Sequence, residues 1–152
     1  MSGAEQGGPA SASVVSHLGL CVSDLERSRR FYCEGLGFEL AEVHDIDNTY
    51  GRALEVEGDV RLTSQFIRKE GMAIELLGYA SPGVHGEPSH SRNQLGLTHL
   101  SFYVSDVDAA AAQLVDLGAK ILEDTRTALG DFELMFLADP DGVRIELMKG
   151  GA

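Results

Sequence analysis

The sequence predicts an α+β fold made of two similar halves, each with the order strand, helix and three further strands. The first observation is a repeat: residues 17–26 (HLGLCVSDLE) match residues 99–108 (HLSFYVSDVD), with His, Leu, Val, Ser and Asp at the same offsets. The second is another repeat, in which residues 71–77 (GMAIELL) and 142–148 (GVRIELM) share the pattern G-x-x-I-E-L. Duplicated stretches of this kind indicate duplicated structural units.

Helix signals follow each His-bearing strand. Ser23 and Ser105 are good N-cap residues, and an acidic residue three positions later (Glu26 or Asp108) completes a capping box. The second helix then shows an apolar face at helical spacing, formed by Val107, Ala110, Ala111, Leu114 and Leu117. Glycines are expected to end both helices, Gly35 and Gly37 the first and Gly118 the second.

Alternating apolar residues predict the remaining strands. We expect them at residues 37–44, 60–68 and 72–79 in the first half, and at 119–123, 132–138 and 143–149 in the second. Residues 48–56 are expected to form a short helix within an insertion. The predicted organisation is a disordered tail (1–13), a first module (14–80), a linker loop (81–95), a second module (96–149) and a short tail (150–152).

Composition argues against several classes of function. The 152 residues carry a formal net charge of −12, which disfavours binding to nucleic acids and to anionic membranes. No apolar run is long enough to span a bilayer, and the first residues do not resemble a signal peptide. The two cysteines, Cys21 and Cys33, form no CxxC pair, so we expect reduced thiols in a cytoplasmic protein.

The repeated His and Glu residues predict a metal site. Side chains alternate between the two faces of a strand, so His17, Glu75, His99 and Glu146 are all expected on the face away from the helices. A carboxylate among buried aliphatic residues is costly unless it is paired, solvated or bound to a metal. Two imidazoles and two carboxylates suit a divalent ion such as Zn, Ni, Co, Mn or Fe.

The same residues carry a family resemblance. Residues 17–38 (HLGLCVSDLERSRRFYCEGLGF) and 139–147 (DPDGVRIEL) resemble the opening and the last hairpin of the vicinal oxygen chelate superfamily, also called the glyoxalase/bleomycin-resistance/dioxygenase superfamily. The resemblance covers about residues 14–149. It implies paired β-α-β-β-β modules that form a half-open mixed β-sheet cup with the helices on the outside.

The four filled positions are similar to those of bacterial glyoxalase I. Extradiol dioxygenases and fosfomycin-resistance proteins use three ligands and need no carboxylate at the Glu75 position, methylmalonyl-CoA epimerases usually carry Gln there, and bleomycin-sequestering members generally lack the metal residues. The resemblance thus implies a metal-dependent, glyoxalase-like lyase or isomerase. Its substrate would be a small 2-oxo or 2-hydroxy compound, converted through a metal-stabilised enediolate with Glu146, or else Glu75, as the base.

Two other functions stay open at this point. One is an Fe(II) dioxygenase of the same superfamily, and the other is a non-catalytic small-molecule-binding or resistance protein. Candidates for lining the cup are Cys21, Gln65, Tyr79, Tyr103, Arg144 and Met148. A homodimer is expected, with the cup formed either within one chain or between the first half of one chain and the second half of its partner.

Overall fold

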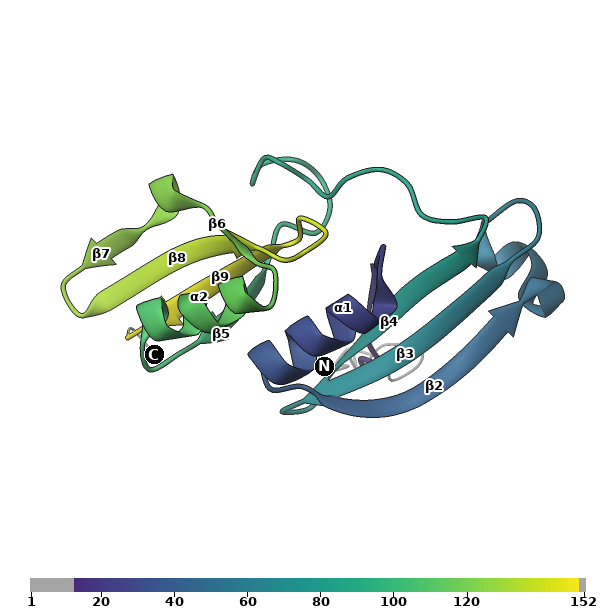
Figure 1. The fold of residues 1–152 in the computed structure, drawn as a ribbon, viewed down its shortest axis with the longest axis horizontal. Coiled ribbons are helices and arrows are strands. Elements are labelled where there is room, and N and C mark those ends of the chain that lie inside the picture. The colour runs from purple at the N-terminus through teal and green to yellow at the C-terminus, as the bar shows by residue number, and fades with distance from the viewer. Residues whose placement is uncertain (1–12, 151–152) are drawn as a thin grey trace, which may run out of the picture.

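The computed structural model describes residues 13–150, so nearly all of the two predicted tails lies outside the described residues. It confirms the α+β fold class of two modules, each a mixed sheet with a helix packed on one face (Figure 1). The two helices face each other across the middle of the molecule, and the sheets lie at either end. None of the described helices is long and apolar enough to cross a membrane.

The first module contains a four-stranded sheet in the order β1-β4-β3-β2. Its elements are β1 (Leu18–Cys21), α1 (Leu25–Arg30), the π-helical turn η1 (Phe31–Gly35), β2 (Glu39–Asp47), the 3-10 segment η2 (Asn48–Leu54), β3 (Arg61–Lys69) and β4 (Met72–Ser81). Strand β1 is parallel to β4, and the other pairs are antiparallel. The three predicted strands and the short helix of the insertion are confirmed, with shifts of a few residues at their ends.

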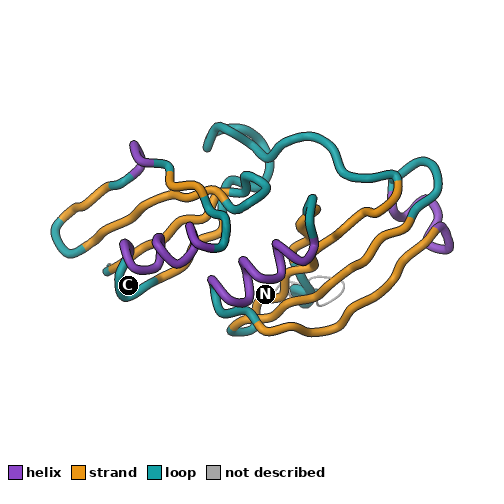
Figure 2. Tube along the Cα trace, in the orientation of Figure 1, coloured by secondary structure: helices purple, strands orange, loops and turns teal. Residues whose placement is uncertain are grey.

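The second module repeats this plan in the order β5-β9-β8-β6, and β7 also pairs with β8. Its elements are β5 (Leu100–Tyr103), α2 (Val107–Asp116), β6 (Lys120–Ile121), η3 (Glu123–Thr125), β7 (Thr127–Leu129), β8 (Phe132–Ala138) and β9 (Arg144–Lys149). The sequence did not predict β7, because its three residues are all exposed and show no apolar alternation. The strand predicted at 119–123 is shorter than expected and gives way to η3 (Figure 2).

The helix caps lie one residue later than predicted. Asp24 and Asp106 are the N-caps, and each carboxylate accepts a hydrogen bond of 2.9 Å from the backbone N–H three residues further on. The predicted capping boxes starting at Ser23 and Ser105 are therefore wrong. Ser23 instead donates from its backbone N–H and its hydroxyl to Asp141, in the turn between β8 and β9.

Both modules contribute to one hydrophobic core. Its fully buried side chains include Phe31, Tyr32, Ile67, Ile74, Leu114, Leu137 and Ile145. Gly37 and Gly118 follow the helix ends with φ of +74° and +100°, as predicted for glycine at that position. Gly35 lies inside η1, where a Cβ would approach the Leu114 side chain of α2 to 2.7 Å. The missing side chain at Gly35 thus allows the two modules to pack closely.

A buried polar contact also joins the modules. The Tyr32 hydroxyl donates to Oδ2 of Asp139 at 2.9 Å, and Oδ1 of the same carboxylate accepts from the backbone N–H groups of Asp141 and Val143. Burial raises the pKa of the Asp139 carboxyl, and these hydrogen bonds oppose that rise because they favour the charged form. Burial also raises the pKa of Tyr32, which keeps its hydroxyl protonated as the donor.

Candidate metal centre

The structure arranges the four predicted residues as two His–Glu pairs. Nε2 of His17 lies 3.1 Å from Oε2 of Glu75, and Nε2 of His99 lies 3.4 Å from Oε2 of Glu146. The pairs arise from the strand register. Each His precedes the first strand of its module (β1 or β5), which runs parallel to the last strand (β4 or β9) that carries the Glu.

The second ring nitrogen of each histidine faces a hydroxyl from the preceding residue. Ser16 Oγ lies 2.8 Å from Nδ1 of His17, and Thr98 Oγ1 lies 2.9 Å from Nδ1 of His99. A proton on Nδ1 that is donated to the hydroxyl oxygen leaves the Nε2 lone pair free to bind a cation. An outer partner of this kind is typical of histidines that bind metals.

A phenylalanine stands edge-on to each histidine ring. The ring centroids of Phe66 and His17 are 5.1 Å apart, with an angle of 83° between the ring planes. Those of Phe136 and His99 are 5.3 Å apart, with an angle of 87°. Each is directly opposite the glutamate of its module in the antiparallel ladder. Sequence reasoning missed both residues, although the S-x-F of β3 and the L-x-F of β8 stand at matching positions.

The distances within each pair fit two ligands of one ion. Donor atoms about 2.1 Å from a metal lie about 3.0–3.5 Å apart when the angle between them is between octahedral and tetrahedral. Both pairs fall in this range. The Glu75 and Glu146 side chains are only 16% and 14% exposed, so a cation would compensate for charge that is largely removed from water. The donor set therefore fits a divalent ion.

The two pairs do not meet within one chain. Among residues 13–150, no three His, Cys, Asp or Glu side chains are grouped closely enough to hold a metal ion. The separation follows from the packing, because the helix-covered faces of both sheets share one core and the pairs lie on the opposite, uncovered faces. Each chain therefore presents two separate His–Glu pairs, called the half-sites below, rather than one cluster of four residues.

Several predicted cup residues share the face of the half-sites. Cys21 and Tyr79 lie on alternate positions from His17 and Glu75, and burial raises the pKa of both side chains. Tyr103 is exposed on the matching strand of the second module. The prediction for Gln65 is wrong. This side chain is buried on the other face of β3, opposite Leu76, and its amide donates to backbone carbonyls at the β2 bulge.

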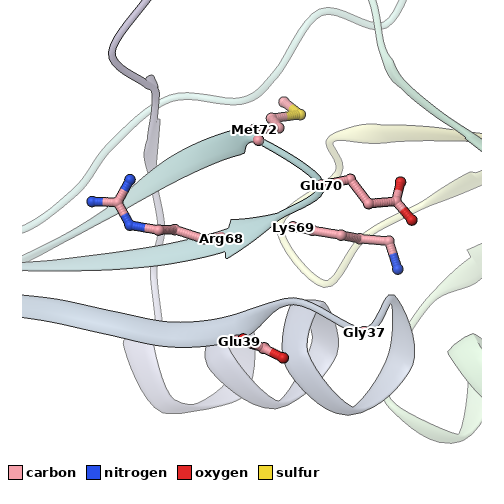
Figure 3. Close-up of a pocket in the computed structure, with 7 residues that line it drawn as sticks. Gly37, Glu39, Arg68, Lys69, Glu70 and Met72 are labelled. Carbon is pink, nitrogen blue, oxygen red and sulfur yellow. The ribbon is translucent and has the colours of Figure 1, made fainter.

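Among several surface hollows outside the half-sites, two include residues described above. One, of about 400 Å³, is between the end of β1 and the linker and includes Cys21, His85, Glu87 and Asp141. The other, of about 370 Å³, is at the β3–β4 turn (Figure 3). There the Arg68 side chain extends to the opposite side from Lys69 and Glu70, and charges of both signs line the wall. The mixed charge of this second hollow indicates no particular ligand.

Comparisons with known proteins agree with the fold. The family model described as "Glyoxalase/Bleomycin resistance protein/Dioxygenase superfamily" matches residues 14–147. The uncharacterized protein YaeR of Escherichia coli (strain K12) is 31% identical over 89% of this chain and 95% of its own length. A 2-epi-5-epi-valiolone epimerase of Actinomyces sp is 32% identical over 91% of this chain and 80% of its own length. The crystal structure of a glyoxalase family protein from Bacillus cereus has the same fold, with a TM-score of 0.78 and 18% sequence identity. The match covers 93% of this chain and 98% of that protein.

Proposed function

Because this chain belongs to the glyoxalase/bleomycin resistance protein/dioxygenase superfamily, we propose that it is a metal-dependent isomerase or lyase that acts on a small 2-oxo or 2-hydroxy compound. The observation that carries the proposal is the duplicated His–Glu pair, with ligand-like spacing in both modules. The similarity to an epimerase over most of the chain favours isomerase chemistry. A fourth protein ligand disfavours the Fe(II) dioxygenase, which needs open positions for both substrate and O₂.

Four side chains would hold the ion, namely His17, Glu75, His99 and Glu146. A bound divalent ion would act as a Lewis acid on a substrate carbonyl oxygen and would lower the cost of negative charge on it. Glu146 would accept the proton from the neighbouring carbon, and the C–H electron pair would move toward the carbonyl. Release of that proton from Glu146 to solvent, and addition of a solvent-derived proton to the opposite face of the same carbon, would invert the centre. Phe66 and Phe136 would keep water from one side of the reacting atoms.

We propose further that the complete site forms between two copies of this chain. His17 and Glu75 of one copy would meet His99 and Glu146 of the other, on sheet faces that no helix covers. A two-fold axis creates two such sites at once, because each copy supplies its first pair to one and its second pair to the other. The two half-sites support a second copy of this chain as the partner, because each half-site holds two of the four proposed ligands.

Mixing two defective variants tests this arrangement. One variant carries His17→Ala and Glu75→Gln, and the other carries His99→Ala and Glu146→Gln. Each alone should bind no tightly held ion. A mixed dimer, isolated with two different affinity tags, should regain one ion per dimer, because one of its two sites carries all four native residues. If the mixed dimer stays without metal while the wild-type protein binds it, the proposed shared site is contradicted.

A solvent-exchange assay tests the chemistry. The metal-loaded protein is incubated in D₂O with a panel of chiral 2-oxo and 2-hydroxy acids and sugars, and deuterium at the carbon next to the carbonyl is followed by NMR. We expect incorporation with at least one compound and none with the Glu146→Gln variant. Tight binding of compounds without exchange would instead indicate a protein that only sequesters its ligand. Oxygen consumption with the Fe(II)-loaded protein would favour the dioxygenase.

A further inference from the structure

The two carboxylates of the proposed centre are held differently. Both oxygens of Glu75 have a partner, since Oε1 accepts from the Ser64 hydroxyl at 2.5 Å and Oε2 faces His17. In Glu146 a single oxygen serves both contacts, since Oε2 accepts from Ser101 at 2.7 Å and also faces His99. Within residues 13–150, no hydrogen bond fixes Oε1 of Glu146. One glutamate is thus fixed at two points and the other at one.

This difference comes from which neighbouring strand carries the hydroxyl. In the first module Ser64 lies on β3, diagonal to Glu75, while the position beside Glu75 on β1 is Gly19. In the second module Ser101 lies beside Glu146 on β5. The position that matches Ser64 is Leu134, which pairs with Met148 as Ser64 pairs with Leu77. The first module therefore carries its hydroxyl at Ser64, where the second has Leu134, and the second carries its hydroxyl at Ser101, where the first has Gly19.

The surroundings of the two hydroxyls strengthen the contrast. Ser64 is fully buried, whereas Ser101 is exposed. Glu75 and Glu146 are themselves almost equally exposed, so the difference lies in the donors. Water can take the place of a hydroxyl removed from the exposed Ser101 position, but it cannot reach the buried Ser64 position, where Oε1 of Glu75 would lose its donor. The contact from Ser64 therefore restricts Glu75 more than the contact from Ser101 restricts Glu146.

We propose that Ser64 is a positioning residue that holds Glu75 in place as a carboxylate ligand, whereas Glu146, which is held through one oxygen, stays free to turn toward the substrate as the proposed proton acceptor. This inference rests on the proposed function, because it assigns different roles to two residues of that centre. In the proton transfer, the substrate C–H bond breaks, an O–H bond forms on Glu146, and the electron pair stays on the substrate. Ser64 takes no part in the transfer and acts only through Glu75.

Metal affinity of the full-length protein, measured by competition with a chromophoric zinc chelator, tests the proposal without any substrate. We expect Ser64→Ala to weaken zinc binding by about 10-fold or more, the range found for outer partners of metal ligands. The matched variant Ser101→Ala should change it by about threefold or less, since water replaces the exposed hydroxyl. Glu75→Gln should cost more affinity than Glu146→Gln. Urea unfolding of each zinc-free variant separates a lost ligand contact from a damaged fold.

A rescue variant distinguishes positioning from simple packing. A Cβ at Gly19 would lie 3.5 Å from the Leu77 side chain, an ordinary contact, so Gly19→Ser fits. Adding it to Ser64→Ala places the hydroxyl where the second module has it, and we expect part of the zinc affinity to return. A role of Ser64 in packing alone would leave the affinity of the double variant as low as that of Ser64→Ala.

Two results would overturn the proposal. One is a Ser64→Ala protein that folds and binds zinc as tightly as the wild type, and the other is an equal or larger loss from Ser101→Ala. Failure of the proposed function looks different, because then the wild-type protein itself would bind no zinc in the same titration.

Discussion

Each candidate metal ligand is in contact with the hydroxyl of a neighbouring residue that is not itself a candidate ligand. Hydroxyls of Ser16 and Thr98 face the Nδ1 atoms of the histidines, and hydroxyls of Ser64 and Ser101 hold the glutamates. The sequence alone indicated the four candidate ligands, because His and Glu recur at matching positions in the two halves. It did not predict Ser64, since that contact depends on the register between β3 and β4 and the second half carries Leu at the matching position.

The hydroxyl of Thr98 supplies a test at the scale of one residue. Thr98→Val keeps the shape of the side chain but removes the group that faces Nδ1 of His99. We expect zinc affinity to fall by about 10-fold, because the ring is no longer held with Nε2 toward the metal. The control Thr98→Ser retains the hydroxyl and should bind zinc as the wild type does. Equal affinity of the Thr98→Val and Thr98→Ser proteins would show that the hydroxyl does not orient the ring.

At the scale of elements, the strands were easier to predict than the helix starts. Strands such as β4 and β8 combine apolar alternation with clear turns at their ends, so their positions agree within two residues. Both helices begin after a Ser-Asp pair in which either residue is a good N-cap, and the spacing favoured the serine. The aspartate is the cap in both helices, and at α1 the serine, Ser23, is engaged instead by Asp141 from the other module. Only the packing of the two modules shows that contact.

The contact between η1 and the β8–β9 turn gives a prediction about stability. Tyr32→Phe removes the donor to Oδ2 of the buried Asp139. The free energy of unfolding should fall by about 1–3 kcal/mol, the cost of leaving a buried polar group without a partner. Urea unfolding at neutral pH measures the loss. A loss much smaller than this would show that the turn rearranges or that water replaces the phenol.

The pH dependence of that loss has a definite sign. Burial already raises the pKa of the Asp139 carboxyl in the folded state, and removal of the Tyr32 hydroxyl should raise it further, because that hydrogen bond favours the charged form. A raised folded-state pKa means stability that is present in acid and lost as the pH rises through it. The difference in stability between Tyr32→Phe and the wild type should therefore shrink in acid, where Asp139 is protonated in both proteins. A difference in stability that is constant with pH would contradict this role of the charged Asp139 carboxylate.

At the scale of the whole molecule, the repeat predicted what each half looks like but not how the halves are placed. The four ligands can converge either within a chain or between chains, and the pattern of the sequence is the same in both cases. The packing of the two modules favours convergence between chains. With Gly35 against Leu114 and Tyr32 bonded to Asp139, the two helix-covered faces share a core and the His–Glu pairs stay apart. This packing is the reason for proposing a site that is shared between two copies.

An anomalous-scattering map of crystals grown with zinc tests this shared site most directly, with data collected on both sides of the zinc absorption edge. We predict two equivalent peaks per dimer, each held by His17 and Glu75 of one copy and by His99 and Glu146 of the other. A peak bound by a single His–Glu pair, a peak at other residues, or no peak in crystals of the dimer would contradict the account.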